Sequence, residues 1–357
     1  MSKLLYIQIL RAGAALSIAV LHAQHDTEAL AARLGRPFER IDQFPWAAGV
    51  DVFFVISGFI MVYASRAMFA SSGAQRTFLT RRMARIVPLY WTVTTLYLAV
   101  ALASPALLNS EIIAPWPVIA SYLFLPFERP DGLVQPVYSL GWTLNFEMYF
   151  YVLFALALVW PLRKAVPVLT AVLGALVVLG QAFRLPEPLA FWTSPLILEF
   201  AFGIWLGLLK AEGFVLPRPV RAALAAGALG LLLVSGSTGL PRVLAYGLPA
   251  ALLVAAAALG VEREKAMAWP ARIGVALGDA SYALYLVHPF VIRAGRELAL
   301  RTGLGAAIGP WGYLVLVVLG ALLASVLVFR LFERPATELA RRWLDRPRVP
   351  RLAPVDS

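Results

Sequence analysis

Long hydrophobic runs separated by short polar connections dominate the chain up to about residue 332. A helix that crosses a bilayer needs about 20 mostly apolar residues. Ten runs come close to that length, near residues 5–24, 46–65, 86–104, 137–160, 166–183, 190–209, 220–236, 243–261, 273–293 and 311–332. The pattern therefore predicts an all-α integral membrane protein with about ten transmembrane helices. The apolar stretch 112–127 is short and interrupted by proline, which favours an interfacial or re-entrant element there.

Composition agrees with a membrane protein. The chain is 61% hydrophobic and only 14% charged, and its mean hydropathy of +0.77 lies well above that of ordinary soluble domains. Cysteine is absent, which excludes a disulfide framework and a thiolate nucleophile. Only three histidines occur, so we expect no metal site.

Basic residues are distributed unequally between the two sets of connections. If the N-terminus lies in the cytoplasm, most Arg and Lys fall on the cytoplasmic side, near 66–85, 163–164, 210–221, 263–272 and from 334 onward. The positive-inside rule then predicts that both termini are cytoplasmic, as an even number of spans requires. The net charge of +11 is thereby explained by membrane orientation, and we expect no nucleic-acid partner.

The domain organisation is simple. We expect residues 1–345 to form one transmembrane domain and the Pro- and Arg-rich residues 346–357 to be a disordered basic cytoplasmic tail. The N-terminus resembles a signal peptide, because Lys3 precedes an apolar stretch. Arg11 interrupts that stretch, however, which favours a retained first helix.

Charged side chains inside the predicted spans are the candidates for function. Asp51 lies within the run AAGVDVFFVISGFIMVY, where an unpaired carboxylate would cost several kcal/mol. Arg11 and His22 are eleven residues apart on the first helix. That spacing places both side chains on one face of the helix. Their directions differ by about 20°, and they lie about 16 Å apart along the helix axis.

The predicted topology sorts these side chains into two levels. A cationic group lies toward the cytoplasm and comprises Arg11, Arg82 and Arg85. An acidic and histidine group lies farther out and comprises His22, Asp51, Glu147 and His288. We predict that a polar pathway through the bundle connects the two levels.

This arrangement suits acyl transfer from acyl-coenzyme A. Arginine recognises phosphate through its fork of donors, so the cationic group could hold the coenzyme head while its arm carries the thioester toward His22. His22 could accept the proton of an attacking hydroxyl. Asp51 or Glu147 could orient the imidazole, as the acid does in a catalytic triad.

Structural roles stay open for most of these residues. Asp51 could cap a helix, His22 could be an interfacial histidine, His288 could mark a helix end, and the paired arginines could be orientation anchors. Glu199, like Glu147, falls too deep in a predicted span for these explanations, so an interior partner or a polar cavity is expected for both.

Six segments, taken in order, resemble the motifs of the acyltransferase 3 family of membrane-bound O-acyltransferases. They are Arg11 with His22, GVDVFFVISGF (49–59), RRMARIVPLYW (81–91), WTLNFEMYFY (142–151), SYALYLVHP (281–289) and FERP (332–335). The form TLNFEMYFY is most similar to the exopolysaccharide-acetylating branch of the succinoglycan type.

The resemblance implies a multi-pass enzyme of the bacterial inner membrane. Such an enzyme takes acetyl or a similar short acyl group from cytoplasmic acyl-CoA, a co-substrate rather than a bound cofactor. The acceptor is a hydroxyl of an exopolysaccharide, another cell-surface glycan or its lipid-linked precursor. The motifs imply that His22 is catalytic, that Arg11, Arg82 and Arg85 bind the donor, and that Glu147 belongs to the site.

The acceptor site and an alternative function also follow from the buried polar residues. Tyr282, His288 and Glu199 are candidates for an acceptor or supporting polar site. The alternative function is a proton-coupled transporter or exporter that uses the buried Asp, Glu and His as a relay. Transporters often contain internal repeats, and we find no repeat at a fixed period.

Overall fold

The computed structural model describes residues 4–103, 114–236, 239–261 and 268–344. Every regular element in these ranges is helical, which confirms the all-α class. The main helices are α1 (Leu5–Arg33), α2 (Ala48–Ser65), α3 (Ala74–Ala103), α5 (Pro115–Tyr122), α6 (Trp142–Ala157), α7 (Leu162–Ala182), α8 (Leu189–Trp192), α9 (Leu198–Ala211), α10 (Arg218–Ser235), α11 (Leu248–Ala258), α12 (Trp269–Asp279), α13 (Ser281–Arg301), α14 (Leu304–Val328) and α15 (Arg334–Leu344). Short 3₁₀ turns η1 (Arg66–Met68), η2 (Ser139–Gly141) and η3 (Pro195–Ile197) and π-helical turns η4 (Val243–Gly247) and η5 (Phe329–Glu333) join them. The predicted tail 346–357 lies outside the described residues.

Seven helices in the described ranges are long and apolar enough to cross a membrane, and the bent pair α12–α13 can make an eighth. The chain is therefore a multi-pass membrane protein. Two of the ten predicted spans, 190–209 and 243–261, correspond to shorter helices: α9 has 14 residues, and Val243–Ala258 is a shorter apolar helix. The count of ten and the orientation of the termini stay predictions. The stretch 112–127 contains only the short helix α5 in its described part.

The predicted span 273–293 is not one straight helix. It breaks at Ala280, where α12 and α13 meet with a bend of 74°. Gly278 permits this arrangement, because a Cβ atom there would lie 2.1 Å from the backbone oxygen of Gln8. Only a glycine lets α12 approach α1 so closely, and the break places Ser281 at the start of α13.

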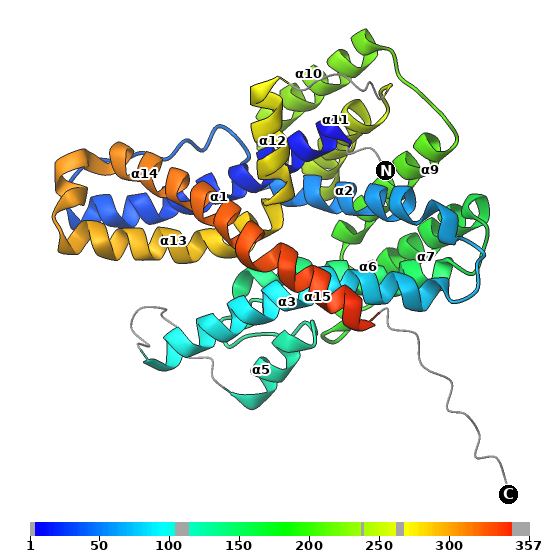
Figure 1. Ribbon diagram of the computed structural model, residues 1–357, viewed down its shortest axis with the longest axis horizontal. Coiled ribbons are helices and arrows are strands. Elements are labelled where there is room, and N and C mark those ends of the chain that lie inside the picture. Colours follow the sequence, from blue (N-terminus) through cyan, green and yellow to red (C-terminus); the bar gives the residue numbers. More distant parts are fainter. Residues whose placement is uncertain (1–3, 104–113, 237–238, 262–267, 345–357) are drawn as a thin grey trace, which may run out of the picture.

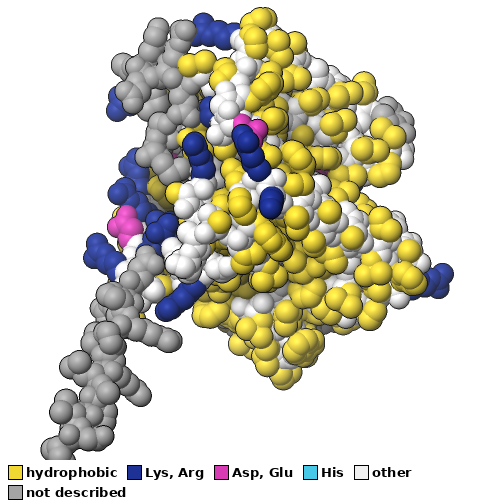
Figure 2. Space-filling view, turned by 90° about the vertical axis from the view of Figure 1, so that its right-hand side faces the viewer, with side chains coloured by type: hydrophobic (Ala, Val, Ile, Leu, Met, Phe, Trp, Pro, Cys, Tyr) yellow, Lys and Arg dark blue, Asp and Glu magenta, His cyan; other side chains and the backbone are white. Residues whose placement is uncertain are grey.

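Figure 1 shows how the long helices are grouped. Helices α1, α13 and α14 run side by side on the left, while α2, α6, α7 and α9 occupy the right, and α15 crosses over α3. Leu319 and Leu323 of α14 are 58% and 65% exposed, as expected for a surface that faces lipid. In Figure 2 hydrophobic side chains cover most of one face, and Lys and Arg gather along one side of it.

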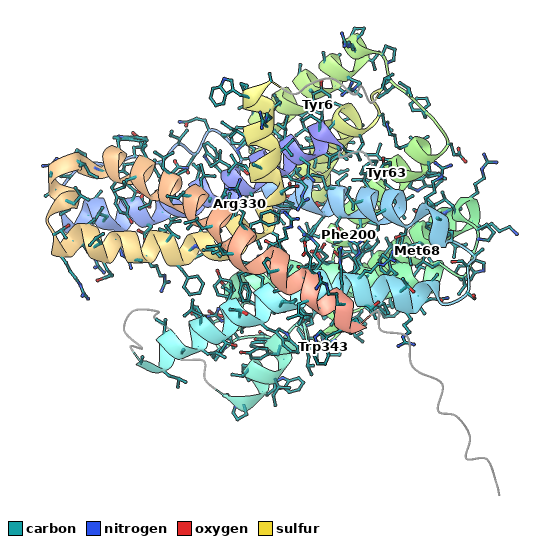
Figure 3. All side chains as sticks on the ribbon, viewed as in Figure 1. Tyr6, Tyr63, Met68, Phe200, Arg330 and Trp343 are labelled. Carbon is teal, nitrogen blue, oxygen red and sulfur yellow. The ribbon has the colours of Figure 1, made fainter. Side chains whose placement is uncertain are left out.

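Helices α2 and α9 form the closest crossing in the centre. A Cβ atom on Gly58 would lie 2.2 Å from the backbone oxygen of Phe200, and Gly203 is equally crowded from the other side. Small residues at such crossings let helix backbones touch, which is the usual basis of helix packing in membranes. The ring of Phe200, labelled in Figure 3, stacks on Phe54 at 4.8 Å and on Phe150 at 4.4 Å.

Candidate active site

A cavity of about 290 Å³ lies among α1, α2, α3, α6 and α13. Five of the nine residues singled out from the sequence line it: Arg11, Arg82, Arg85, Glu147 and Tyr282. They come from four different helices, so the fold brings together side chains that the sequence separates. The three arginines of the predicted cationic group therefore line one cavity, while their position toward the cytoplasm stays a prediction.

The three guanidinium groups of this cavity have different partners. Arg11 donates to Gln8 at 3.2 Å, and Arg85 lies 3.4 Å from Glu333, a carboxylate that is only 1% exposed. Arg82 forms no ion pair within the described residues, and its guanidinium stands 5.5 Å from the centre of the Phe78 ring. Among the charged residues that line the cavity, three are arginines and one is the carboxylate Glu147, so the cavity can accept an anion.

Glu147 belongs to a small hydrogen-bonded network at the cavity wall. Its Oε1 accepts from the hydroxyl of Ser57 on α2 at 3.0 Å and from the hydroxyl of Tyr151. Tyr151 follows Glu147 by four residues on α6, a spacing that puts both side chains on one face. Tyr282 also lines the cavity, and its hydroxyl donates to the backbone oxygen of Ile86 on α3 at 2.8 Å.

His22 contacts a second histidine rather than a carboxylate. Its Nδ1 lies 2.8 Å from Nε2 of His288, whose own Nδ1 lies 2.8 Å from the backbone oxygen of Leu284. Pro289 follows directly and has no N–H, so one backbone hydrogen bond of α13 is missing next to His288.

These contacts define the tautomers of the neutral pair. A carbonyl can only accept, so Nδ1 of His288 donates to Leu284 and Nε2 of His288 is left as an acceptor. Nδ1 of His22 must then donate, and Nε2 of His22 keeps a free lone pair. His22 is partly exposed, whereas His288 is fully buried. Among the two, His22 is the one that can act as a base toward a substrate.

Asp51 and Glu199 lie in a separate cluster at the N-terminal ends of α2 and α9. Asp51 is fully buried and accepts two bonds from Arg242, from Nε at 3.0 Å and from Nη2 at 2.8 Å. Glu199 is also fully buried, next to Gly247, and neither carboxylate is among the residues that line the cavity. We expected Asp51 or Glu147 to orient His22. Asp51 instead pairs with Arg242 and so connects α2 to the residue directly before η4. The orienting contact belongs to His288.

This ion pair predicts an asymmetric effect on stability. Arg242→Gln leaves a fully buried carboxylate without its partner and should lower the free energy of unfolding by about 3–5 kcal/mol. Asp51→Asn should cost less, because the Arg242 side chain is 36% exposed and can reach water. Unfolding of the single and double variants in detergent tests this, and strictly additive effects would contradict a direct pair.

His288 positions the imidazole of His22 through the contact between the two rings. His288→Ala removes one hydrogen bond to His22, worth about 1.5–3 kcal/mol in a charge-assisted case. We expect kcat to fall by about 10–100-fold while KM for the substrate that binds in the cavity stays constant, because His288 does not line the cavity in the described structure. A larger KM with an unchanged kcat would assign His288 to substrate binding instead.

Several residues of these clusters give little signal in the sequence. Arg242 lies in a predicted connection between spans, where an arginine is ordinary, and Glu333 lies in the FERP segment. Ser57 sits within an apolar run, where a hydroxyl gives little signal. Tyr151 could have been found from its spacing of four residues to Glu147, and Gln8 from its spacing of three to Arg11.

Comparisons with known proteins assign the class of this site. Residues 4–330 match the acyltransferase domain model of the acyltransferase 3 family, so the chain belongs to that family and is an acyltransferase. It is 37% identical over 298 residues to the exopolysaccharide production protein ExoZ of Rhizobium meliloti, covering 83% of this chain and 90% of that protein. It is 29% identical over 341 residues to the acyltransferase MdmB of Streptomyces mycarofaciens, covering 82% of this chain and 81% of that protein. No solved structure matches the chain.

Proposed function

We propose that the protein transfers acetyl, or a similar short acyl group, from cytoplasmic acyl-CoA to a hydroxyl of an exopolysaccharide. Another cell-surface glycan or a lipid-linked precursor would present the same hydroxyl chemistry. The observation that carries this proposal is the pairing of an anion-accepting cavity, which Arg11 and Arg82 line, with a histidine whose Nε2 is free. Similarity to an exopolysaccharide production protein supports the choice of a glycan. We place this reaction in the bacterial inner membrane, where a multi-pass protein has access to cytoplasmic acyl-CoA.

The proposed reaction balances without a metal or a redox partner. The phosphates of the donor bind at the arginines, and the pantetheine arm brings the thioester toward His22. Nε2 of His22 takes the proton of the acceptor hydroxyl as its oxygen attacks the carbonyl carbon. The C–S bond then breaks, the ester is formed, and the proton passes to the coenzyme thiolate. His288 holds the ring of His22 and polarises its Nδ1–H through the bond at 2.8 Å.

The polysaccharide made by cells tests this function directly. Cells with and without the protein are compared by NMR of their surface polysaccharide, with a His22→Ala variant expressed to the same level as the control. We expect ester signals only with the unaltered protein. Identical ester content in all three would refute the proposal. A transporter would instead change the amount of polysaccharide outside the cell and leave its esters unchanged.

A further inference from the structure

The cavity ends short of His22. On α1, Arg11, Ala15, Ala19 and His22 follow one another at spacings of four, four and three residues, so they share one face. Arg11 lines the cavity, whereas His22 is not among its lining residues. Ala15 and Ala19 are 0% and 1% exposed, so the segment between the two levels is packed rather than open. The continuous polar pathway that we expected from the sequence is therefore closed in this structure.

Phe53 of α2 packs into this closed segment. Its ring lies against the apolar cluster that Ala15 and Ala19 form with Leu284 and Ala321. Phe53 also lines the cavity, so one side of its ring faces the donor space and another faces the small side chains of α1.

The same order holds on α13. Tyr285 lines the cavity, and His288 lies three residues further along the helix. The ring centres of Phe53 and Tyr285 are 6.4 Å apart in an edge-to-face arrangement, and those of Tyr285 and His288 are also 6.4 Å apart. Phe53 and Tyr285 together form the wall between the cavity and the histidine pair.

The two rings of this wall are held differently. The hydroxyl of Tyr285 donates to the backbone oxygen of Leu140 at 3.0 Å and accepts from Thr143 at 3.0 Å, so its position is fixed. Phe53 has no polar atom, is only partly buried, and is held by packing alone. Of the two, Phe53 can turn away without breaking a hydrogen bond.

We propose that Phe53 is the gate of this enzyme, a ring that must turn aside for the thioester to reach His22. The inference rests on the proposed acyl transfer from acyl-CoA. With the ring in place, the donor cavity is separated from the partly exposed side on which the acceptor meets His22. The gate keeps water away from the bound thioester and restricts the acyl groups that can pass between Ala15, Ala19 and Phe53 to short ones.

Release of coenzyme A in the absence of an acceptor measures how well the gate keeps water from the thioester. Without an acceptor, water can attack the carbonyl carbon, break the C–S bond and yield the free acid and the coenzyme thiol. Phe53→Leu replaces the ring with a smaller aliphatic side chain, which closes the passage less completely. We therefore expect this hydrolysis of acetyl-CoA to rise by about tenfold. Use of butyryl-CoA relative to acetyl-CoA should rise as well.

Phe59→Leu is the matched control. Phe59 also lies on α2, but it does not line the cavity in the described structure, and its ring stacks on Tyr63 with ring centres 5.8 Å apart. It should leave acceptor-independent release at the level of the unaltered protein. A purely structural role of Phe53 would give both variants the same release, and that result would overturn the gate.

A second variant keeps the test decisive if Phe53→Leu is unstable. Phe53→Trp enlarges the ring and should lower acyl transfer by more than it lowers binding of coenzyme A, which titration measures separately. Unimpaired transfer by Phe53→Trp would also overturn the gate. Acceptor-dependent transfer by the unaltered protein is recorded first: if it occurs while the Phe53 variants behave as controls, the gate alone fails. If it never occurs, the proposed function fails and the gate with it.

Discussion

Replacing His22 with alanine should lower acyl transfer by about 10²–10⁴-fold, the usual contribution of a general base. The side chain supplies the Nε2 atom that the contact with His288 leaves free to accept a proton. Binding of the acyl donor should not change, because His22 does not line the donor cavity in the described structure. Initial rates of ester formation with purified protein, together with a coenzyme A titration, measure both quantities.

His25 provides the control for this variant. It lies three residues further along α1, is exposed, and contacts Arg40 at 2.7 Å rather than a residue of the site. His25→Ala should therefore retain the rate of the unaltered protein. Equal losses in both variants would mean that the changes disturb α1 in general, and a fully active His22→Ala protein would remove the proposed base from the mechanism.

The second large effect is expected at Arg82. Its guanidinium lines the cavity and has no carboxylate in ion-pair contact in the described part of the chain. A charge-assisted hydrogen bond contributes about 1.5–3 kcal/mol, so Arg82→Ala should raise KM for acetyl-CoA by about 10–100-fold. The effect should nearly vanish with S-acetylpantetheine, which carries the thioester but no phosphate.

Arg81 tests whether this effect is specific. It precedes Arg82 on α3 but is exposed and does not line the cavity. Arg81→Ala should change KM little, apart from a small loss of general electrostatic attraction that salt screens. If Arg82→Ala weakens both donors alike, the cavity does not recognise phosphate at this residue.

The sequence predicted the residues of the cavity better than their partners. Arg11 and His22 are related by helical spacing alone, and the paired arginines and Glu147 stood out because charge is rare in apolar spans. Partners depend on how distant helices pack: His22 and His288 are 266 residues apart, and Asp51 and Arg242 are 191 apart. Nothing local in one sequence specifies which helices meet, so the assignment of Asp51 to His22 had no geometric basis.

The helical class followed from hydropathy, but the breaks did not. The run 273–293 is mostly apolar, and its length suits a span. Its bend of 74° reflects the packing of α12 on α1 at Gly278, which periodicity cannot reveal. Phe53 was missed for a similar reason. An apolar ring in an apolar helix gives no signal, and its position matters only because it stands between the cavity and the histidine pair.

Proteoliposomes loaded with radiolabelled acetyl-CoA and an acceptor glycan test the central claim most directly. The label should appear as an ester on the glycan, with one coenzyme thiol released for each ester, and His22→Ala vesicles should form neither. Movement of glycan or label across the membrane with no release of coenzyme A would contradict the account and identify a transporter.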